Sequence, residues 1–193
     1  QTYGELAAEA DRRAGQWQQM GLVSGDRLLL QGANSPEWVQ SYFAATLSGI
    51  VVVPVDTQTP ADEIERLIEY VDARALIAPM ETLQSVDEVT SLLRIDLDSG
   101  DKVIGDRAGE GKPGRKTADV EFVEPTVDAQ TQASIIFTSG TRVDPRGVVL
   151  THGNFVADLV ALAEVQPVEA SDQILSLLPL HHGLEFTGGL LMS

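Results

Sequence analysis

The sequence of 193 residues contains no cysteine. The chain can therefore form no disulfide bond, and it cannot use a thiol as a catalytic nucleophile. A composition without cysteine fits a reducing compartment, so the sequence predicts a cytoplasmic location. The chain is nevertheless 43% hydrophobic, which is enough to bury the core of one large domain.

Positive charge is also scarce, because 13 Lys and Arg residues face 29 Asp and Glu residues, for a net charge of -16. Such a surface repels the phosphates of nucleic acids and of anionic lipids, so neither is an expected partner. The chain has no apolar run near the ~18 residues of a membrane-spanning helix. Its first residues also lack the basic and apolar regions of a signal peptide. We therefore expect that the protein is not an integral membrane protein.

Helix signals begin at the N-terminus. Thr2 and Glu5 have the spacing of a capping box, so a helix is predicted from about Tyr3. Gly21 is suited to the left-handed position that follows a helix, so the helix is expected to end there.

Two further helices are predicted by the same signals. Ser35 and Pro36 suit the N-cap and first position of a helix that Gly49 can end. Thr59 and Pro60 repeat the pattern before a third helix. That helix is amphipathic, with an apolar face of Ile64, Leu67, Ile68 and Val71 and a solvent face of Glu63, Glu65, Arg66 and Glu69.

Short apolar runs without polar alternation lie between these helices, at Arg27 to Leu30, Ile50 to Val53 and Ala75 to Ala78. Such runs suit strands that are buried on both faces. Because they alternate with helices, they predict βαβ units in a doubly wound α/β fold, with a mostly parallel sheet and helices on both faces.

The segment from Leu97 to Val127 is polar and rich in glycine, so we interpret it as a surface loop or an edge hairpin. Gly109 to Thr117 superficially resembles a nucleotide-binding P-loop, but the glycine spacing is wrong and Pro113 replaces the required hydroxyl residue. A solvated basic loop is the better interpretation. Val120 to Val123 is a candidate strand.

The segment from Ile135 to His152 is the most informative part of the chain. Two β-branched runs, Ile135 to Thr138 and Val148 to Thr151, flank hydroxyl residues, glycines and arginines. This order is typical of a strand, a phosphate loop and a strand, because uncovered backbone N–H groups, hydroxyls and a cation all bind anions. An ordinary hairpin loop is the alternative. The predicted phosphate-binding residues are Thr138, Ser139, Gly140, Thr141, Arg142, Arg146 and Gly147.

This loop resembles the signature loop of the acyl-adenylate-forming superfamily, which includes acyl-CoA synthetases, adenylation domains of peptide synthetases and luciferases. The family pattern is Thr-Ser-Gly-Thr-Thr-Gly, any residue, Pro-Lys-Gly-Val. The chain departs from it at Arg142, Val143 and Arg146, which stand for Thr, Gly and Lys. Arg146 keeps the charge with a different geometry. Val143 would be strained at a positive φ, so either the loop takes another path or the alignment contains an insertion.

The resemblance extends along nearly the whole chain, at Thr2 to Leu6, Gly25 to Leu30, Asn34 to Trp38 and Val53 to Asp56. It therefore implies that the chain forms part of the large N-terminal domain of an adenylate-forming enzyme. On this basis, residues 1–128 are expected to form a first α/β subdomain. Residues 129–193 would begin a second subdomain that carries the phosphate loop.

Downstream, Asn154 to Val165 is predicted to be a largely buried helix and Ile174 to Leu178 a buried strand. The Pro-Leu-His-His sequence that follows resembles a second family marker. The resemblance places His182 in the gating position beside the acyl-adenylate and the thiol tunnel, and His181 in a variable position. A packing or hydrogen-bonding role is the alternative for both histidines. His152, between a strand and a helix, is expected to be structural. No metal-ligand set is recognised.

The resemblance implies that the parent protein activates a carboxylic acid, with a fatty acid favoured, by using ATP and Mg²⁺ to form an acyl-AMP. The acyl group would pass to coenzyme A or to the phosphopantetheine of an acyl carrier protein. Because relatives are more than twice as long, the chain is interpreted as a fragment that is inactive alone. A non-catalytic adenylation-fold protein, either a pseudoenzyme or an assembly module, is the alternative, since Arg142 and Val143 depart from the pattern.

Overall fold

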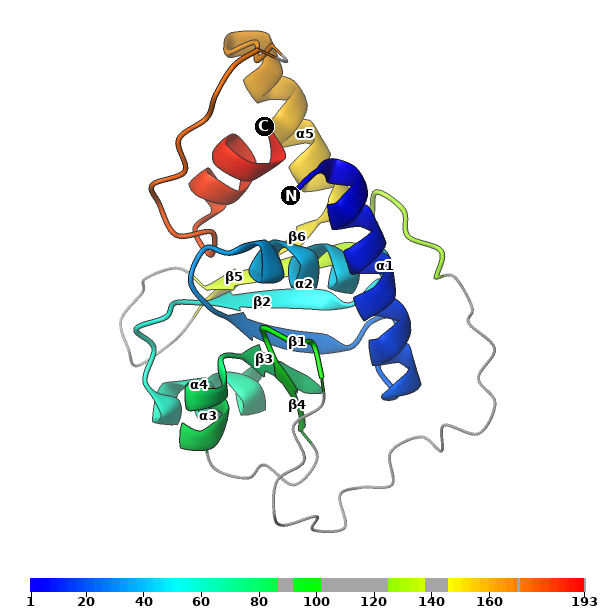
Figure 1. Ribbon diagram of the computed structural model, residues 1–193, viewed down its shortest axis with the longest axis vertical. Helices are drawn as coiled ribbons and strands as arrows, with labels where there is room; N and C mark the ends of the chain where they lie inside the picture. Colours follow the sequence, from blue (N-terminus) through cyan, green and yellow to red (C-terminus); the bar gives the residue numbers. More distant parts are fainter. Residues whose placement is uncertain (87–91, 102–124, 138–145, 170, 193) are drawn as a thin grey trace.

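The computed structural model describes residues 1–86, 92–101, 125–137, 146–169 and 171–192. Within them, six strands form one sheet in the order β4-β3-β1-β2-β5-β6 (Figure 1). All neighbouring strands pair in parallel except β5 and β6, which are antiparallel. The predicted α/β fold with a mostly parallel sheet is confirmed. The strands are β1 (Arg27–Gln31), β2 (Val51–Val55), β3 (Ala75–Ala78), β4 (Leu93–Asp96), β5 (Gln132–Phe137) and β6 (Gly147–Thr151).

Helices cover both faces of the sheet, as Figure 1 shows. α1 (Tyr3–Gln19) and α2 (Pro36–Leu47) pack on one face, and α3 (Ala61–Val71) and α4 (Met80–Ser85) pack on the other. Successive strand residues point to opposite faces, so Leu28 and Leu30 join the first core whereas Leu29 joins the second. The uninterrupted apolar runs of the sequence therefore reflect a sheet that is buried on both sides.

The predicted caps of the first two helices are confirmed. Thr2 accepts a hydrogen bond from the Glu5 backbone N–H at 3.2 Å, and the Glu5 carboxylate accepts one from the Thr2 N–H at 2.8 Å. Ser35 caps α2 by accepting from the Trp38 N–H at 3.1 Å. Gly21 and Gly49 follow the two helices with φ of 94° and 66°, a region that side chains rarely adopt.

The start of α3 differs from the prediction by one position. Pro60, and not Thr59, occupies the N-cap, and no side chain caps the helix. Asp62 and Glu63 instead place negative charge in the first turn, where it complements the helix dipole. The predicted apolar face of α3 is confirmed, because its four residues are all buried. The short elements α4 and β4 were not predicted, since neither carries a clear periodic pattern.

Two predictions near the C-terminus are wrong. The stretch from Ile174 to Leu178 forms no strand, and Leu175 and Leu177 are 77% and 76% exposed. Its apolar residues meet no neighbouring strand within the described chain. The predicted helix forms as α5 (His152–Val165), but Phe155 is its only buried residue. The broad apolar surface of α5 is therefore largely exposed. A π-helix, η1 (Glu185–Leu191), follows.

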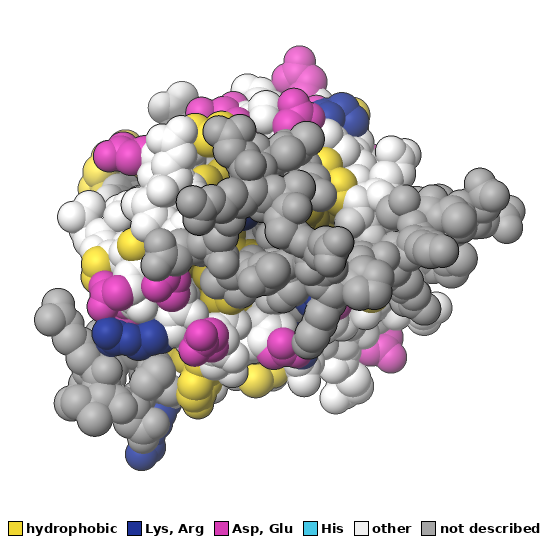
Figure 2. Space-filling view, turned by 90° about the horizontal axis from the view of Figure 1, so that it is seen from below, with side chains coloured by type: hydrophobic (Ala, Val, Ile, Leu, Met, Phe, Trp, Pro, Cys, Tyr) yellow, Lys and Arg dark blue, Asp and Glu magenta, His cyan; other side chains and the backbone are white. Residues whose placement is uncertain are grey.

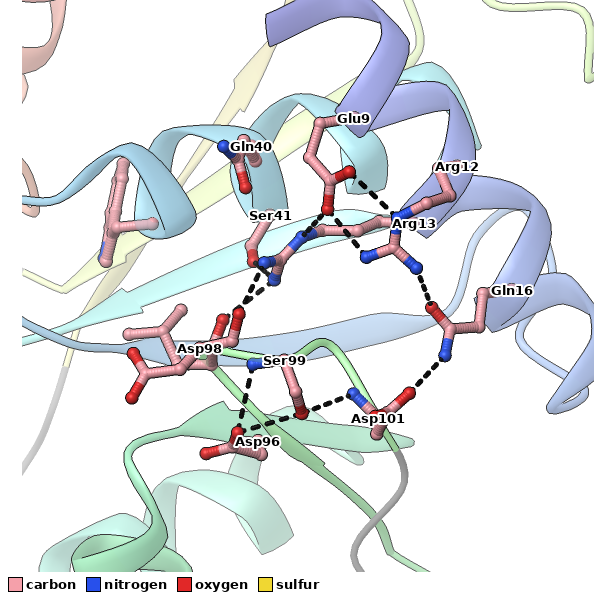
Figure 3. Close-up of polar contacts among 12 residues, drawn as sticks. Glu9, Arg12, Arg13, Gln16, Gln40, Ser41, Asp96, Asp98, Ser99 and Asp101 are labelled. Atoms are coloured by element: carbon pink, nitrogen blue, oxygen red, sulfur yellow. Dashed lines mark hydrogen bonds and ion pairs between the residues drawn. The ribbon is translucent and has the colours of Figure 1, made fainter. Parts of the chain in front are cut away.

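A buried arginine joins α1 and α2 to the turn after β4. Arg13 is 2% exposed and donates to the backbone oxygens of Leu97 and Asp98 at 2.8 and 3.0 Å and to the Ser41 hydroxyl at 3.1 Å. Figure 3 shows this network together with Glu9. Hydrogen bonds, first from Arg12 and then from Arg13, lower the pKa of Glu9 to about 2.

The surface reflects the acidic composition. Figure 2 shows Asp and Glu side chains spread across the face that is seen from below. No helix in the described ranges is long and apolar enough to cross a membrane.

The predictions for Gly109 to Thr117 and Val120 to Val123 lie outside the described residues. The division at residues 128 and 129 stays a prediction.

Candidate functional site

The carboxyl edge of the parallel strands is the natural place for a site. β1, β2 and β5 run in the same direction, so their C-terminal ends meet at one edge of the sheet. In open α/β sheets, ligands bind at this edge, where connections leave the strands. Gln31 ends β1, Asp56 follows β2 and Phe137 ends β5. We call this region the carboxyl edge.

The two strands that flank the predicted phosphate loop pair at the carboxyl edge. Phe137, at the end of β5, pairs with Gly147, at the start of β6. Arg146, the last residue before β6, is exposed. Gly147 has a steric reason to be glycine, because a Cβ there would approach the Ile135 side chain to 2.7 Å. The other predicted phosphate-binding residues, Thr138, Ser139, Gly140, Thr141 and Arg142, lie outside the described residues, as does Val143.

An amide side chain holds residues 179–182, which we call the histidine turn, at the same edge. The Asn34 side chain donates to the Leu178 backbone oxygen at 2.8 Å and accepts from the Leu180 N–H at 2.8 Å. The turn also reaches β5, since a Cβ on Gly183 would lie 3.8 Å from the Ile136 Cδ1 atom. The structure therefore brings the histidine pair beside the strand that leads into the phosphate loop.

The two histidines have different surroundings. The His182 side chain is exposed, and its backbone N–H donates to the Pro179 oxygen at 3.0 Å. The His181 side chain is 9% exposed and lies 3.6 Å from the Asp56 carboxylate. Burial lowers the pKa of His181, which Asp56 partly opposes and His182 reinforces. The imidazole rings are 4.4 Å apart between centroids.

His152 lies at the junction between β6 and α5, as the sequence predicts. It is the first residue of α5, and its backbone N–H donates to the Thr131 oxygen at 3.0 Å. Burial lowers the pKa of the His152 imidazole, with Asp128 opposing it. These contacts belong to the base of the hairpin and support the structural role that we expected.

The π-helix η1, which follows the histidine turn in the chain, is held by an aromatic cluster. Phe186 packs against Tyr42 at 4.2 Å between ring centroids and against Trp38 and Phe155. Glu185 is buried, and its Oε2 atom accepts from the Leu178 N–H at 3.3 Å. This aromatic cluster ties η1, and with it the turn of His182, to α2 and α5.

Sequence reasoning missed the polar residues that organise the carboxyl edge. Gln31 donates from Nε2 to the Asp56 backbone oxygen at 2.9 Å, and Asn34 holds the histidine turn. Their signal was available, because polar residues at the end of a buried strand, or in the connection that follows it, lie at the ligand-binding edge of a parallel sheet. In the described part of the chain, no group of three or more His, Asp or Glu residues could hold a metal ion.

Known proteins resemble the chain over most or nearly all of its length. The medium-chain acyl-CoA ligase ACSF2 of Pongo abelii, a mitochondrial protein, is 26% identical over 99% of this chain and 36% of its own length. A fatty acid–[acyl-carrier-protein] ligase, MmaC of Mycobacterium marinum, is 31% identical over 80% of this chain and 29% of its own length. The chain therefore spans about a third of the length of these relatives.

Solved structures share the fold. A structure from a study of fatty acyl-adenylate ligases of E. coli and L. pneumophila superposes with a TM-score of 0.79 and 26% identity, over 100% of this chain and 34% of that one. The family described as AMP-binding enzyme matches residues 1–193. This match covers both the β5–β6 hairpin and the histidine turn, and it establishes that the chain belongs to the AMP-binding enzyme family.

Proposed function

We propose that the whole protein carrying this chain activates a carboxylic acid with ATP, and that a fatty acid is the preferred substrate. The observation that carries the proposal is the placement of the β5–β6 hairpin and of the histidine turn at the same carboxyl edge. Relatives named for medium-chain acyl-CoA and fatty acid ligation support the substrate class.

In the proposed reaction, a carboxylate oxygen attacks the α-phosphorus of ATP. The bond from that phosphorus to the bridging oxygen breaks, and pyrophosphate leaves. Negative charge then builds on the leaving group, where backbone N–H groups, hydroxyls and Arg146 would stabilise it without any covalent role. Mg²⁺ would accompany the nucleotide phosphates. The residues assigned to the phosphates are Thr138, Ser139, Gly140, Thr141, Arg142, Arg146 and Gly147.

A thiol then accepts the acyl group. Its sulfur attacks the acyl carbon, the bond from that carbon to the AMP oxygen breaks, and the thiol proton is released. Coenzyme A and the phosphopantetheine of a carrier protein are both candidate acceptors, because one similar protein is named for each. His182 is exposed beside β5 and would gate access of this thiol to the acyl-AMP.

The test is ATP–pyrophosphate exchange by the full-length protein with a panel of fatty and aromatic acids. We expect exchange with at least one fatty acid, and a loss of about 100-fold when Ser139→Ala and Arg146→Ala are combined. Arg66→Ala, which removes an exposed arginine of α3, is the matched control and should leave exchange unchanged. Absence of exchange with every acid would reject the proposal.

A non-catalytic role is the second candidate, because Arg142 and Val143 depart from the family loop. Calorimetric titration of the full-length protein with Mg-ATP separates the two. Binding that disappears in the double variant supports the enzyme, whereas absent or unaffected binding supports the non-catalytic protein.

The lack of cysteine favours a location in the cytoplasm, while the Pongo abelii relative is mitochondrial. Imaging of the tagged protein would distinguish these compartments.

A further inference from the structure

The ring of His181 is enclosed at the carboxyl edge with one nitrogen still to be satisfied. Its Nε2 atom is buried and has no hydrogen-bond partner among the described residues. A buried imidazole nitrogen without a partner is costly, so its neighbours indicate how the ring is held. Among the described residues, the Asp56 carboxylate lies close to it, with its Oδ2 atom 3.6 Å from Nε2.

Asp56 is fixed by contacts that leave this oxygen available. Its Oδ1 atom accepts from the Gln58 backbone N–H at 2.9 Å, and its backbone oxygen accepts from the Gln31 amide at 2.9 Å. The Oδ2 atom is thereby directed towards His181. A separation of 3.6 Å is too long for a hydrogen bond, so the contact is electrostatic in this structure and a shift of about 0.5 Å would convert it into one.

The His181 ring also lies against the ring of His182. The two rings are 4.4 Å apart and inclined by 42°, so the exposed ring of His182 rests on the enclosed one. Burial lowers the pKa of His181, which Asp56 opposes and His182 reinforces, so the surroundings of the ring favour its neutral form. A neutral ring can support His182 without repulsion between like charges, and its Nε2–H can face the anion of Asp56.

We propose that Asp56 and His181 form a positioning pair that fixes the orientation of the His182 ring. Asp56 sets the tautomer and angle of the His181 ring, and this ring sets the surface against which His182 packs. The pair connects the end of β2 to the histidine turn, so it couples the sheet directly to the proposed gate. The functional consequence rests on the proposed function, whereas the pairing itself can be tested without any activity.

The first experiment is NMR of the protein with ¹⁵N-labelled histidine. The sequence holds three histidines, so His152→Gln and His182→Gln together assign the three rings. We expect His181 to carry its proton on Nε2 in the native protein. Asp56→Asn should reduce this preference, lower the pKa of His181 further and shift the ring signals of His182. The asparagine keeps the Oδ1 acceptor for Gln58, so the turn is preserved.

The matched control is Asp62→Asn, which removes an exposed carboxylate of α3 that pairs with Arg66. This substitution should leave the ring signals of His181 and His182 unchanged. If Asp56→Asn moves neither the His181 tautomer nor the His182 signals by more than this control does, the positioning pair is wrong.

The second experiment measures acyl transfer to coenzyme A by the full-length protein, because His182 is proposed to gate the thiol, and pyrophosphate exchange reports the adenylation step separately. His181→Phe keeps a ring for packing but removes Nε2, whereas His181→Gln keeps a donor near that position. We expect Asp56→Asn and His181→Phe each to lower kcat about three- to tenfold with the KM for ATP unchanged, and the double variant to be no worse than either alone. His181→Gln should recover most of the rate.

Additive losses in the double variant, or a native rate for His181→Phe, would overturn the coupling to His182. If no acid supports exchange, the proposed function fails, and the NMR comparison alone then decides whether the pair exists. The two failures are therefore distinguishable.

Discussion

Arg13 shows how one charged residue can organise a core. Its guanidinium satisfies two backbone oxygens of the turn after β4 and a hydroxyl of α2, so it serves as a polar bridge between three elements. A planar group with five donors suits this task, whereas the ammonium of lysine presents its donors at one point. A buried charge is tolerated only when it is paired and hydrogen-bonded, and Glu9 and these oxygens meet that condition.

We predict that Arg13→Ala lowers the free energy of unfolding by about 3 kcal/mol, because it leaves buried oxygens without donors and opens a cavity. Arg13→Lys should cost about 1–2 kcal/mol, since it keeps the charge but loses the fork. Arg12→Ala is the control, because that side chain is exposed and its loss should cost less than about 1 kcal/mol. Urea unfolding measures all three. Equal values for Arg13→Ala and Arg12→Ala would refute the bridging role.

The sequence could not reveal residues of this kind. Arg13 lies on a helix with other charged residues, and its burial depends on a turn that is more than 80 residues away in the chain. Asp56 and Asn34 could be placed near the carboxyl edge from the strand pattern, but not their partners. Such contacts depend on tertiary geometry, whereas caps such as Thr2 and Ser35 depend on residues three positions apart and were predicted correctly.

At the scale of elements, local chemistry predicts where helices begin and strands lie, but not what covers them. The β1 to β3 strands were recognised because apolar runs between capped helices have one good explanation. The same reasoning failed for Ile174 to Leu178, where an apolar run has no adjacent strand in the described chain. The π-helix also escaped prediction, since its geometry differs from an α-helix in hydrogen bonding and not in composition.

Two glycines within helices provide a pair of substitutions whose expected effects on stability have opposite signs. Gly153 lies in the first turn of α5, and a Cβ there would lie 2.7 Å from the Ala129 backbone oxygen. We expect Gly153→Ala to separate this turn from the base of the hairpin and to cost about 1–3 kcal/mol of stability. Gly15 lies inside α1, and a Cβ added there would meet nothing within 4 Å, so Gly15→Ala should instead add about 0.5–1 kcal/mol.

Thermal unfolding monitored by circular dichroism compares the two variants. The melting temperature should fall for Gly153→Ala and rise for Gly15→Ala. If both substitutions shift the melting temperature in the same direction, the close contact between α5 and the 128–131 turn does not determine the stability of the Gly153→Ala variant.

At the scale of the whole molecule, the candidate site is a product of topology. No single element contains it, because β5 precedes the predicted phosphate loop, Asp56 follows β2 and the histidine turn follows α5. The flanks of the loop were predicted from two β-branched runs, whereas the approach of the histidine turn to β5, through Gly183 and Ile136, depends on tertiary structure. The family match over residues 1–193 agrees with this assembly.

An exposed apolar surface on α5 leads to the last prediction. Val156 and Val160 are 58% and 57% exposed, and four positions apart they share one helix face. In the chain alone, we expect Val156→Glu combined with Val160→Lys to reduce binding of a hydrophobic dye and self-association, because the new pair is polar and can attract across one turn. Val23→Lys, at an isolated exposed valine, is the control and should change neither quantity.

The same double substitution gives a different result if a longer polypeptide covers this face. The chain corresponds to 36% of the length of the Pongo abelii ligase, so a protein of that length has ample chain to pack against α5. Burying two charged residues there would destabilise the longer protein by about 2–4 kcal/mol, whereas an exposed face would tolerate them. Urea unfolding of the full-length protein separates these outcomes, and equal stability of the native and doubly substituted forms would show that this face of α5 remains in solvent.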